Sequence, residues 1–460
     1  MAKSQVQFVC QRCGRISAAY MGKCPQCSEF GTMVEQVVSP PTVRKRASSR
    51  STGVGSSRPQ KLGQVSTDDI TRLTVPIQEF SRVLGGGIVP GSLILVGGDP
   101  GIGKSTLLLE VAALMAKHHG PCLYVSGEES VRQIKMRADR MGLKSDDLYL
   151  VTETNLETIL DHIEEIKPVL TIVDSIQTTY TGELSSSAGS VSQVRECASR
   201  FQELAKIQGL AVCLVGHVTK DGAIAGPRVL EHIVDTVLYL EGDPFNRYRL
   251  LRGVKNRFGA TSEVGVFEMA EQGMVEVTNP SQAFLAERQV NSSGSAIAVT
   301  MEGTRPLLVE IQALVNSTSF ANPRRTSNGI DYNRLLLLTA VLSRRAKLNL
   351  SDKDVFANVV GGLQIGEPAA DLAVAVAIAS SIRDKPVHAD MAFMGEIGLS
   401  GELRTVRQLD IRLREADKLG FRRCLIPRGA KKVLGKIPAK LEVIACTSLT
   451  EALSEALISR

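Results

Sequence analysis

The chain has 460 residues, of which 43% are hydrophobic, and a formal net charge of +6. This length exceeds one ordinary hydrophobic core, so we expect two or three domains. No apolar run reaches the roughly 18 residues that a membrane span needs, which excludes a membrane-spanning class. The first residues also lack the apolar core of a signal peptide, so we predict a cytoplasmic location.

The charge is unevenly distributed along the chain. Residues 1–65 contain ten Lys or Arg and two acidic residues, residues 300–460 contain 23 basic and 17 acidic residues, and the middle is acidic. Two basic ends around an acidic centre indicate a polyanionic partner that is contacted away from the middle of the chain. Many soluble proteins also have basic tails, so the pattern alone leaves nucleic acid as one option.

A cysteine-rich module comes first. Two CxxC pairs, ten residues apart, comprise Cys10, Cys13, Cys24 and Cys27. Four thiolates complete the tetrahedral shell of a structural Zn²⁺ ion and leave no open position for catalysis. Two disulfides are the alternative, but the cytoplasm disfavours them. We therefore predict a C4 zinc-finger module over residues 1–30, followed over 31–65 by a flexible basic linker rich in Ser, Pro, Gly and Arg.

From about residue 66 the sequence alternates between strand and helix patterns. Apolar runs typical of buried parallel strands occur at 93–96, 122–125, 148–151, 169–173 and 211–215. Helix-period segments separate them, at 105–117, 129–141, 155–167 and 190–208. The strand patterns that follow, 237–240, 248–254 and 264–269, are consecutive and resemble an antiparallel extension. The pattern predicts an α/β domain over 66–290, with helices on both faces of a parallel sheet.

A Ser- and Gly-rich break at 291–295 precedes the last segment. Strand patterns occur there at 296–301, 307–314, 424–426 and 443–445, and helix patterns occur at 331–346, 368–382 and 407–419. We therefore predict a separate α+β domain over residues 291–460.

A phosphate-binding loop joins the first of these strands to the first helix. It comprises Gly98, Asp99, Pro100, Gly101, Ile102, Gly103, Lys104, Ser105 and Thr106. Its glycines let backbone N–H groups curl around the phosphates of ATP, and the helix N-terminus adds its positive dipole end. We predict that Lys104 reaches the β and γ oxygens and that Ser105 ligates Mg²⁺.

Two carboxylates follow strands of this pattern. Asp174 ends the run 169–173 and suits the Walker B position, which holds Mg²⁺ beside Ser105. Glu128 follows the run 122–125, at the sheet edge where open α/β sheets bind ligands. We predict Glu128 as the base that orients the attacking water, with Glu129 as the alternative. Either could instead only cap the next helix.

Five motifs together resemble the bacterial RadA (Sms) family of RecA-like DNA-repair ATPases. They are the phosphate-binding loop, Gly127-Glu-Glu-Ser130, Asp174-Ser-Ile-Gln177, Gly216-His-Val-Thr-Lys220 and Lys255-Asn-Arg-Phe-Gly259. The resemblance covers nearly the whole chain and implies a zinc finger, a RecA-like core and a Lon-protease-like C-terminal domain. It also implies a homo-oligomer, as a hexameric ring, whose ATPase is stimulated by DNA. Such a ring would move on single-stranded DNA and drive branch migration of branched DNA together with the recombinase RecA.

The resemblance assigns roles to further residues. It implies that Lys255 and Arg257 act at the nucleotide of the neighbouring subunit. It also implies that two polar loops face the central channel of the ring: 178–190, which we expect to be flexible, and 219–228, which carries Lys220 and Arg228. Cations and mobile loops suit sequence-independent binding of single strands, although both loops could be ordinary surface connections.

A basic run lies near the C-terminus. Residues 420–440 contain seven Lys or Arg and no acidic residue. The candidates for contact with a phosphate backbone are Arg422, Arg423, Lys431 and Lys432. A solvated basic face is the alternative interpretation.

The Lon-like segment raises the question of proteolysis. The resemblance places Ala369 at the position of the nucleophilic serine and Asp410 at that of the basic lysine. Alanine cannot attack a carbonyl, and an aspartate cannot act as the neutral amine base. We therefore predict a scaffold for oligomerisation and DNA contact, and no protease. A nucleotide-dependent DNA-binding scaffold or switch, which does not translocate, remains the alternative function for the whole chain.

Overall fold

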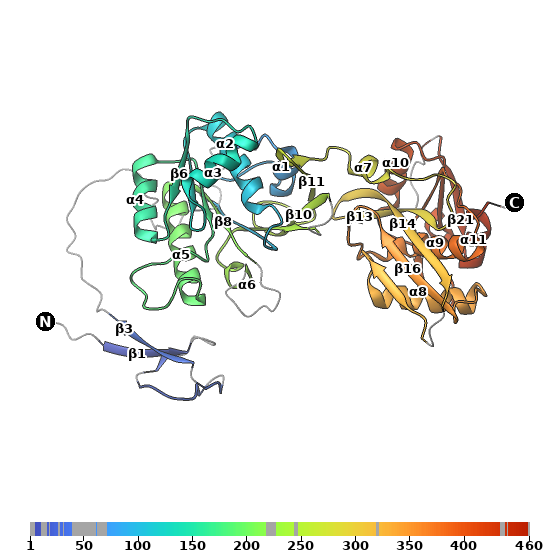
Figure 1. Cartoon of the computed structure of the whole chain (residues 1–460), viewed down its shortest axis with the longest axis horizontal. Coiled ribbons are helices and arrows are strands. Elements are labelled where there is room, and N and C mark those ends of the chain that lie inside the picture. Colours follow the sequence, from blue (N-terminus) through green and yellow to red (C-terminus); the bar gives the residue numbers. More distant parts are fainter. Residues whose placement is uncertain are drawn as a thin grey trace. The chain divides into compact units, whose positions relative to one another are not determined.

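The computed structural model describes residues 5–10, 16–17, 19–25, 28–30, 32–38, 61, 71–217, 227–242, 247–318, 322–432, 438 and 440–458. The chain divides into two compact units (Figure 1). The first comprises Met1–Pro76, Gly86–Leu238 and Val254–Gly259, and the second comprises Ile77–Gly85, Tyr239–Gly253 and Ala260–Arg460. The units therefore alternate along the sequence, and the domain border predicted after residue 290 stays a prediction. None of the described helices is both long enough and apolar enough to cross a membrane.

The N-terminal module is a three-stranded antiparallel sheet. Its strands are β1 (Gln5–Cys10), β2 (Ile16–Ser17) and β3 (Met33–Val38), in the order β2-β1-β3. Its described core consists of Cys10 and Cys24, with Phe8 packed against them. Two buried cysteines at this position fit a module that depends on a bound metal ion for its stability.

A parallel sheet forms the centre of the first unit. Its order is β9-β4-β8-β7-β5-β6, and β4, β8, β7, β5 and β6 run parallel. The bounds are β4 Leu93–Gly98, β5 Cys122–Ser126, β6 Leu148–Thr152, β7 Leu170–Asp174, β8 Ala211–Val215 and β9 Thr236–Glu241. Every residue of β4, β5, β7 and β8 is buried. Because these strands are buried along their whole length, their sequences are continuous apolar runs.

Five helices accompany this sheet in the described part of the chain. They are α2 (Lys104–His119), α3 (Val131–Arg140), α4 (Leu156–Ile166), α5 (Val191–Gln208) and α6 (Pro227–Leu230). Side chains of Ser130, Asn155 and Ser190 cap α3, α4 and α5 by accepting backbone N–H bonds. These helices begin one or two residues later than predicted, because a capping residue has an extended backbone.

The second unit contains an antiparallel meander, β10-β11-β12, except for the end of β10 from Val254, which groups with the first unit. Its elements are α1 (Gln78–Leu84), β10 (Tyr248–Asn256), β11 (Val264–Ala270), β12 (Gly273–Glu276) and α7 (Pro280–Leu285). The buried Glu79 of α1 accepts hydrogen bonds from the backbone N–H of Val266 (2.8 Å) and from Arg305 (2.5 Å). These two bonds explain why α1, which precedes the parallel sheet in sequence, groups with the second unit.

A seven-stranded sheet of order β15-β16-β14-β13-β17-β20-β21 forms the rest of the second unit. Its strands are β13 Ser295–Glu302, β14 Arg305–Ser317, β15 Arg325–Asn328, β16 Lys353–Val359, β17 Met391–Phe393, β20 Arg423–Pro427 and β21 Glu442–Cys446. The strands β18 (Glu396–Ile397) and β19 (Leu403–Arg404) form a separate antiparallel hairpin. The helices are α8 Tyr332–Arg345, α9 Asp371–Arg383, α10 Leu409–Lys418 and α11 Leu449–Ala456, with 3-10 turns η2 (Pro368–Ala370) and η3 (Arg428–Lys432).

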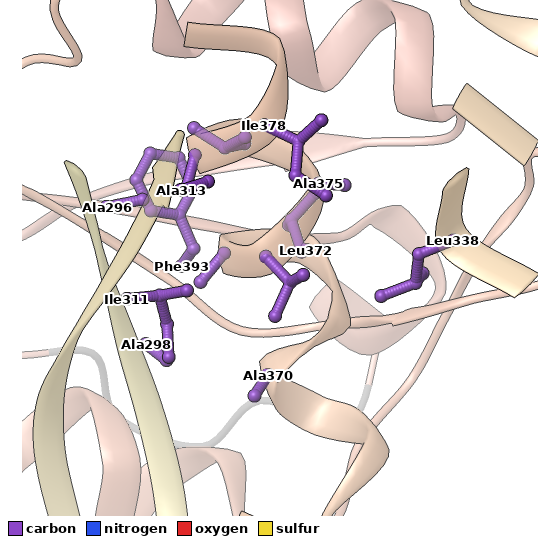
Figure 2. Packing of buried hydrophobic residues seen from close by; sticks show 14 of the residues in the cluster. Ala296, Ala298, Ile311, Ala313, Leu338, Ala370, Leu372, Ala375, Ile378 and Phe393 are labelled. Carbon is purple, nitrogen blue, oxygen red and sulfur yellow. The ribbon is translucent and has the colours of Figure 1, made fainter. Parts of the chain in front are cut away.

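Alternation along β13 divides the core of this sheet in two. Ala296 and Ala298 belong to one buried cluster, with α9, whereas Ile297 and Val299 belong to a second cluster, with α10. Figure 2 shows the first cluster, in which side chains of α9 meet those of β13 and β14. A strand that is covered on both faces in this way lies at the centre of an α/β sandwich.

An arginine is buried completely in the second cluster. Arg412 of α10 has 0% exposure and donates to the carbonyls of Val299 (2.7 Å) and Arg407 (3.0 Å) and to the carboxylate of Glu367. The other oxygen of Glu367 accepts the backbone N–H of Met301 at 2.8 Å. Each nitrogen of the guanidinium therefore has a hydrogen-bond partner, and the side chain ties α10 to β13 and to the residues before η2.

Replacing this arginine is expected to destabilise the second unit. Arg412→Ala leaves two carbonyls and Glu367 without their donor, and the unfolding free energy should fall by about 3–5 kcal/mol. Urea denaturation followed by circular dichroism measures the loss. Arg414→Ala, on the exposed side of the same helix, is the matched control and should change stability by less than about 0.5 kcal/mol. Equal midpoints for the two variants would show that the buried pair contributes nothing.

Candidate nucleotide-binding site

The predicted phosphate-binding loop connects β4 to α2. Gly98, Gly101 and Gly103 have φ angles of 150°, 76° and 111°, a region that favours glycine. No acidic residue lies in the first turn of α2. The amides at the start of this helix can therefore bind an anion without competition from an acidic side chain of the same turn.

Lys104 points back into the loop. Its Nζ donates to the carbonyls of Gly98 (2.8 Å) and Asp99 (2.9 Å), and the side chain is buried. Burial lowers the pKa of Lys104, while the nearby charges of Asp174, Asp99 and Glu128 act to raise it. The lysine is thus surrounded by acceptors, and the phosphates of ATP would offer it stronger partners than two carbonyls.

Asp174 lies at the end of β7, beside the end of β5. Ser126 and Asp174 are register partners, and the N–H of Gly127 donates to the carbonyl of Asp174 at 2.8 Å. The hydroxyl of Tyr124 donates to Oδ2 of Asp174 at 2.6 Å. A β-carbon at position 127 would lie 2.0 Å from Oγ1 of Thr178, so only glycine fits this crossing.

Glu128 and Glu129 have different partners. Oε1 of Glu128 accepts from Ser175 Oγ at 3.0 Å and lies 3.3 Å from Nε2 of His217. Glu129 instead forms an ion pair with Arg137 at 2.8 Å. Glu128 is therefore the carboxylate that shares the sheet edge with Asp174 and Lys104, and it stays our prediction for the base.

Sequence analysis did not select two polar residues at this edge. Nε2 of Gln177 donates to the carbonyl of His217 at 3.3 Å. Within the described residues, Oε1 of Gln177 and Nδ1 of His217 are buried polar atoms without a hydrogen-bond partner. Such orphaned atoms fit a site that receives a polar ligand. The sequence did contain a signal for both residues, because Gln177 and His217 follow the ends of two buried strands.

The loop 178–190 is not the flexible segment that we expected. The buried amide of Gln193 accepts the N–H of Thr181 at 3.0 Å and donates to the carbonyls of Thr181, Leu184 and Ser186 at 3.1, 3.3 and 2.9 Å. That prediction is wrong because a side chain of α5 satisfies the backbone groups that composition left unassigned. In the second predicted loop, Lys220 lies outside the described residues, and Arg228 belongs to α6.

The cations of the Lys255-Asn-Arg-Phe-Gly259 motif lie away from the loop of their own subunit. Nζ of Lys255 donates to the carbonyls of Glu231 (2.5 Å) and Val234 (2.8 Å), and Arg257 pairs with Asp235 at 2.9 Å. Burial, together with the charge of Arg257, lowers the pKa of Lys255.

Asp235 fixes the place of these cations. Its Oδ2 accepts the backbone N–H of Leu93 at 3.1 Å, at the first residue of β4, whereas the phosphate-binding loop follows the last. A strand of this length spans about 17–20 Å. The motif and the loop therefore lie at opposite ends of β4.

The basic run near the C-terminus is partly paired. Arg423 forms an ion pair with Asp390 at 2.5 Å, and Arg428 forms one with Glu451 at 3.1 Å. Arg422 and Lys431 are exposed, and Lys432 ends η3. Arg422 and Lys431 are thus better placed than Arg423 to contact a phosphate backbone.

The zinc ligands are described in part. Cys13 and Cys27 lie outside the described residues. Cys10 and Cys24 are buried in one cluster, and a turn after Cys24 is closed by hydrogen bonds of 2.8 Å from Ser28 N–H to the Cys24 carbonyl and from Cys24 N–H to the Glu29 carbonyl. Two adjacent buried sulfurs fit the thiolate chemistry of a structural Zn²⁺ site.

The two residues at protease positions are also placed. Ala369 is buried in η2, and its carbonyl accepts the N–H of Gly395 at 2.9 Å. Asp410 lies in the first turn of α10.

Comparisons with known proteins bear on the whole chain. The chain is 52% identical to the DNA repair protein RadA of Halalkalibacterium halodurans over 458 residues, which cover 98% of this chain and 99% of the relative. It is 50% identical to the protein of the same name from Bacillus subtilis over 457 residues, covering 99% and 100%. The chain belongs to the family of the DNA repair protein RadA. This membership confirms the family that the motifs indicated.

Family models match three segments. Residues 8–35 match the rubredoxin metal binding domain, residues 56–223 an AAA domain, and residues 343–459 the Lon protease (S16) C-terminal proteolytic domain. They confirm the predicted α/β RecA-like core, the N-terminal zinc ribbon and the Lon-like C-terminal domain. A KaiC-like protein from Pyrococcus horikoshii is similar at 20% identity and a TM-score of 0.39, over 45% of this chain and 99% of that chain. This last similarity is too low to carry an argument.

Removal of the loop lysine tests the nucleotide site. Lys104→Ala is expected to lower ATP hydrolysis at least about a hundredfold, because the γ-phosphate loses its buried cation. Steady-state phosphate release measures the change. Lys117→Ala, on the exposed last turn of the same helix, is the control and should hydrolyse ATP like the unmodified protein. Turnover retained in Lys104→Ala would contradict the assignment of the loop.

Proposed function

We propose that the protein is a DNA-stimulated ATP hydrolase that assembles into a hexameric ring on single-stranded DNA. It drives branch migration of branched recombination intermediates together with the recombinase RecA, in the cytoplasm. The observation that carries this proposal is the separation of Lys255 and Arg257 from the phosphate-binding loop of their own subunit.

The separation supports an action of these cations in a second subunit. The two cations lie at the first residue of β4 and the loop at the last, so a cation on this motif cannot reach the γ-phosphate bound to its own chain. It can reach the nucleotide of a neighbour, and a closed ring gives every site such a neighbour. Arg257 would then exchange Asp235 for a phosphate, and cations supplied in this way lower the barrier by several kcal/mol, in order of magnitude.

Within one subunit, the residues at the carboxyl edge of the parallel sheet have different roles in ATP hydrolysis. Lys104 and the loop amides bind the β and γ phosphates, and Glu128 orients the attacking water. Ser105 and Asp174 would hold Mg²⁺, which supplies positive charge to the phosphates when bound. Ser175 and His217 fix the carboxylate of Glu128 through the contacts described above.

The remaining cations are candidates for DNA. Lys220 and Arg228 belong to the segment after β8, and Arg422, Lys431 and Lys432 belong to the C-terminal basic run. Arg423 contributes less, because Asp390 already pairs with it. We propose domains at 1–30, 31–65, 66–290 and 291–460, with Zn²⁺ held by Cys10, Cys13, Cys24 and Cys27 in the first.

We propose that the Lon-like domain is a scaffold and not a protease. Ala369 offers no nucleophile, and Asp410 offers no amine base. The buried pair of Arg412 and Glu367 lies close in sequence to both positions and uses its charges to hold η2 and α10 together. Conservation of a fold without the reacting groups is a frequent outcome, because function depends on sites and not on the fold.

The first experiment measures ATP hydrolysis with and without unstructured single-stranded DNA at about 50 and about 200 mM salt. Severalfold stimulation that declines with salt is expected, because counterion release drives the binding of cations to phosphates. A rate that is indifferent to DNA at both salt concentrations would favour the scaffold or switch and contradict a motor.

A second experiment tests the shared site. Lys104→Ala and Arg257→Ala chains, each expected to be inactive alone, are coexpressed with different tags and copurified as mixed oligomers. If Arg257 acts on a neighbour, about a quarter of the interfaces combine an intact loop with an intact arginine, and activity returns to about that fraction. No activity in the copurified oligomer would contradict action in the neighbouring subunit.

A further inference from the structure

We infer that Tyr124 is a positioning residue that fixes which oxygen of Asp174 faces bound Mg²⁺. The inference rests on the proposed role of Asp174 as the carboxylate that holds this ion. It assigns a function to a residue that belongs to neither the loop nor the motifs singled out in the sequence.

The geometry begins with a buried phenol. Tyr124 lies in the middle of β5 with 0% exposure, and its hydroxyl donates to Oδ2 of Asp174 on the adjacent strand β7 at 2.6 Å. Both residues are buried, and a short hydrogen bond to a carboxylate in a buried site is among the stronger ones in proteins.

A neighbouring arginine sets the direction of this bond. An NH group of Arg137 lies 3.5 Å from the hydroxyl oxygen of Tyr124, and a guanidinium can only donate. The phenolic proton is therefore directed to Asp174 and not to Arg137. Arg137 is itself held by two contacts with Glu129, of 3.0 and 2.8 Å.

The consequence is an asymmetric carboxylate. Oδ2 of Asp174 is engaged by Tyr124, whereas Oδ1 has no hydrogen-bond partner in the part of the chain that the structure describes. Lys104 is close enough for the charge of Asp174 to act on it. Without the phenol, the carboxylate could rotate towards this cation, and its preferred orientation for a metal or a metal-bound water would be lost.

Only the hydroxyl carries this role. Phenylalanine at position 124 would keep the ring in the core and remove the donor. Tyr149 offers a matched control, since it lies on β6, the next strand, with 45% of its side chain exposed. Removal of its hydroxyl changes the same atoms at a place that does not contact Asp174.

The experiment measures how strongly Mg²⁺ tightens the binding of a fluorescent ADP to the full chain. Affinity is determined in EDTA and then along a Mg²⁺ titration, with thermal unfolding as the check of folding. For Tyr124→Phe we expect unchanged affinity in EDTA and a Mg²⁺ midpoint raised about tenfold, the effect of a lost hydrogen bond to a charged group. Tyr149→Phe should match the unmodified protein in both.

Further variants separate the possible failures. Arg137→Gln keeps the hydroxyl but removes its constraint, and it should raise the midpoint less than Tyr124→Phe does. In an Asp174→Asn background, Tyr124→Phe should have no further effect. A Tyr124→Phe protein with the unmodified midpoint would overturn the inference, as would equal losses with and without Mg²⁺. If Asp174→Asn alone leaves the midpoint unchanged, the proposed role of Asp174 fails first, and the inference fails with it.

Discussion

Parallel pairing of β4, β8, β7 and β5 is the constraint on which the nucleotide site depends. Parallel strands bring their carboxyl ends to one edge, so residues that follow four separate strands become neighbours. The loop after β4, Glu128 after β5, Asp174 at the end of β7 and His217 after β8 meet there for this reason. Full burial of these strands holds the edge in place, because a shift of register would expose apolar side chains.

The same sheet separates the two sets of groups for which we propose contact between subunits. The opposite end of β4 carries Asp235, which binds the backbone of Leu93 and the guanidinium of Arg257. The phosphate-binding loop and the cations of the Lys255-Asn-Arg-Phe-Gly259 motif thus lie at two ends of one rigid strand. A rigid separation of this kind cannot be closed within the chain, and our proposal therefore brings the two ends together between copies.

The second unit shows how a buried charge can become structural. Arg412 is buried and donates its hydrogen bonds to protein groups. Glu367 accepts hydrogen bonds both from Arg412 and from the backbone of β13. A buried ion pair of this kind contributes little net stability compared with an apolar core, but it allows few alternative packings. The pair joins α10 to β13 and lies in the segment that matches the Lon protease (S16) C-terminal proteolytic domain.

The sequence by itself determined the local features: the buried strands, the loop 98–106, the helices that follow it and the family. These depend on periodicity and on glycines within a few residues, and hydrophobic burial reads directly from such patterns. Only the tertiary structure decided that Tyr124 donates to Asp174, that Gln193 fixes the loop after β7, that α1 joins the second unit, and that Arg412 pairs with Glu367. Each of these findings depends on contacts between residues that are separated in sequence. The choice of partner depends on strand order and register, which local periodicity does not encode.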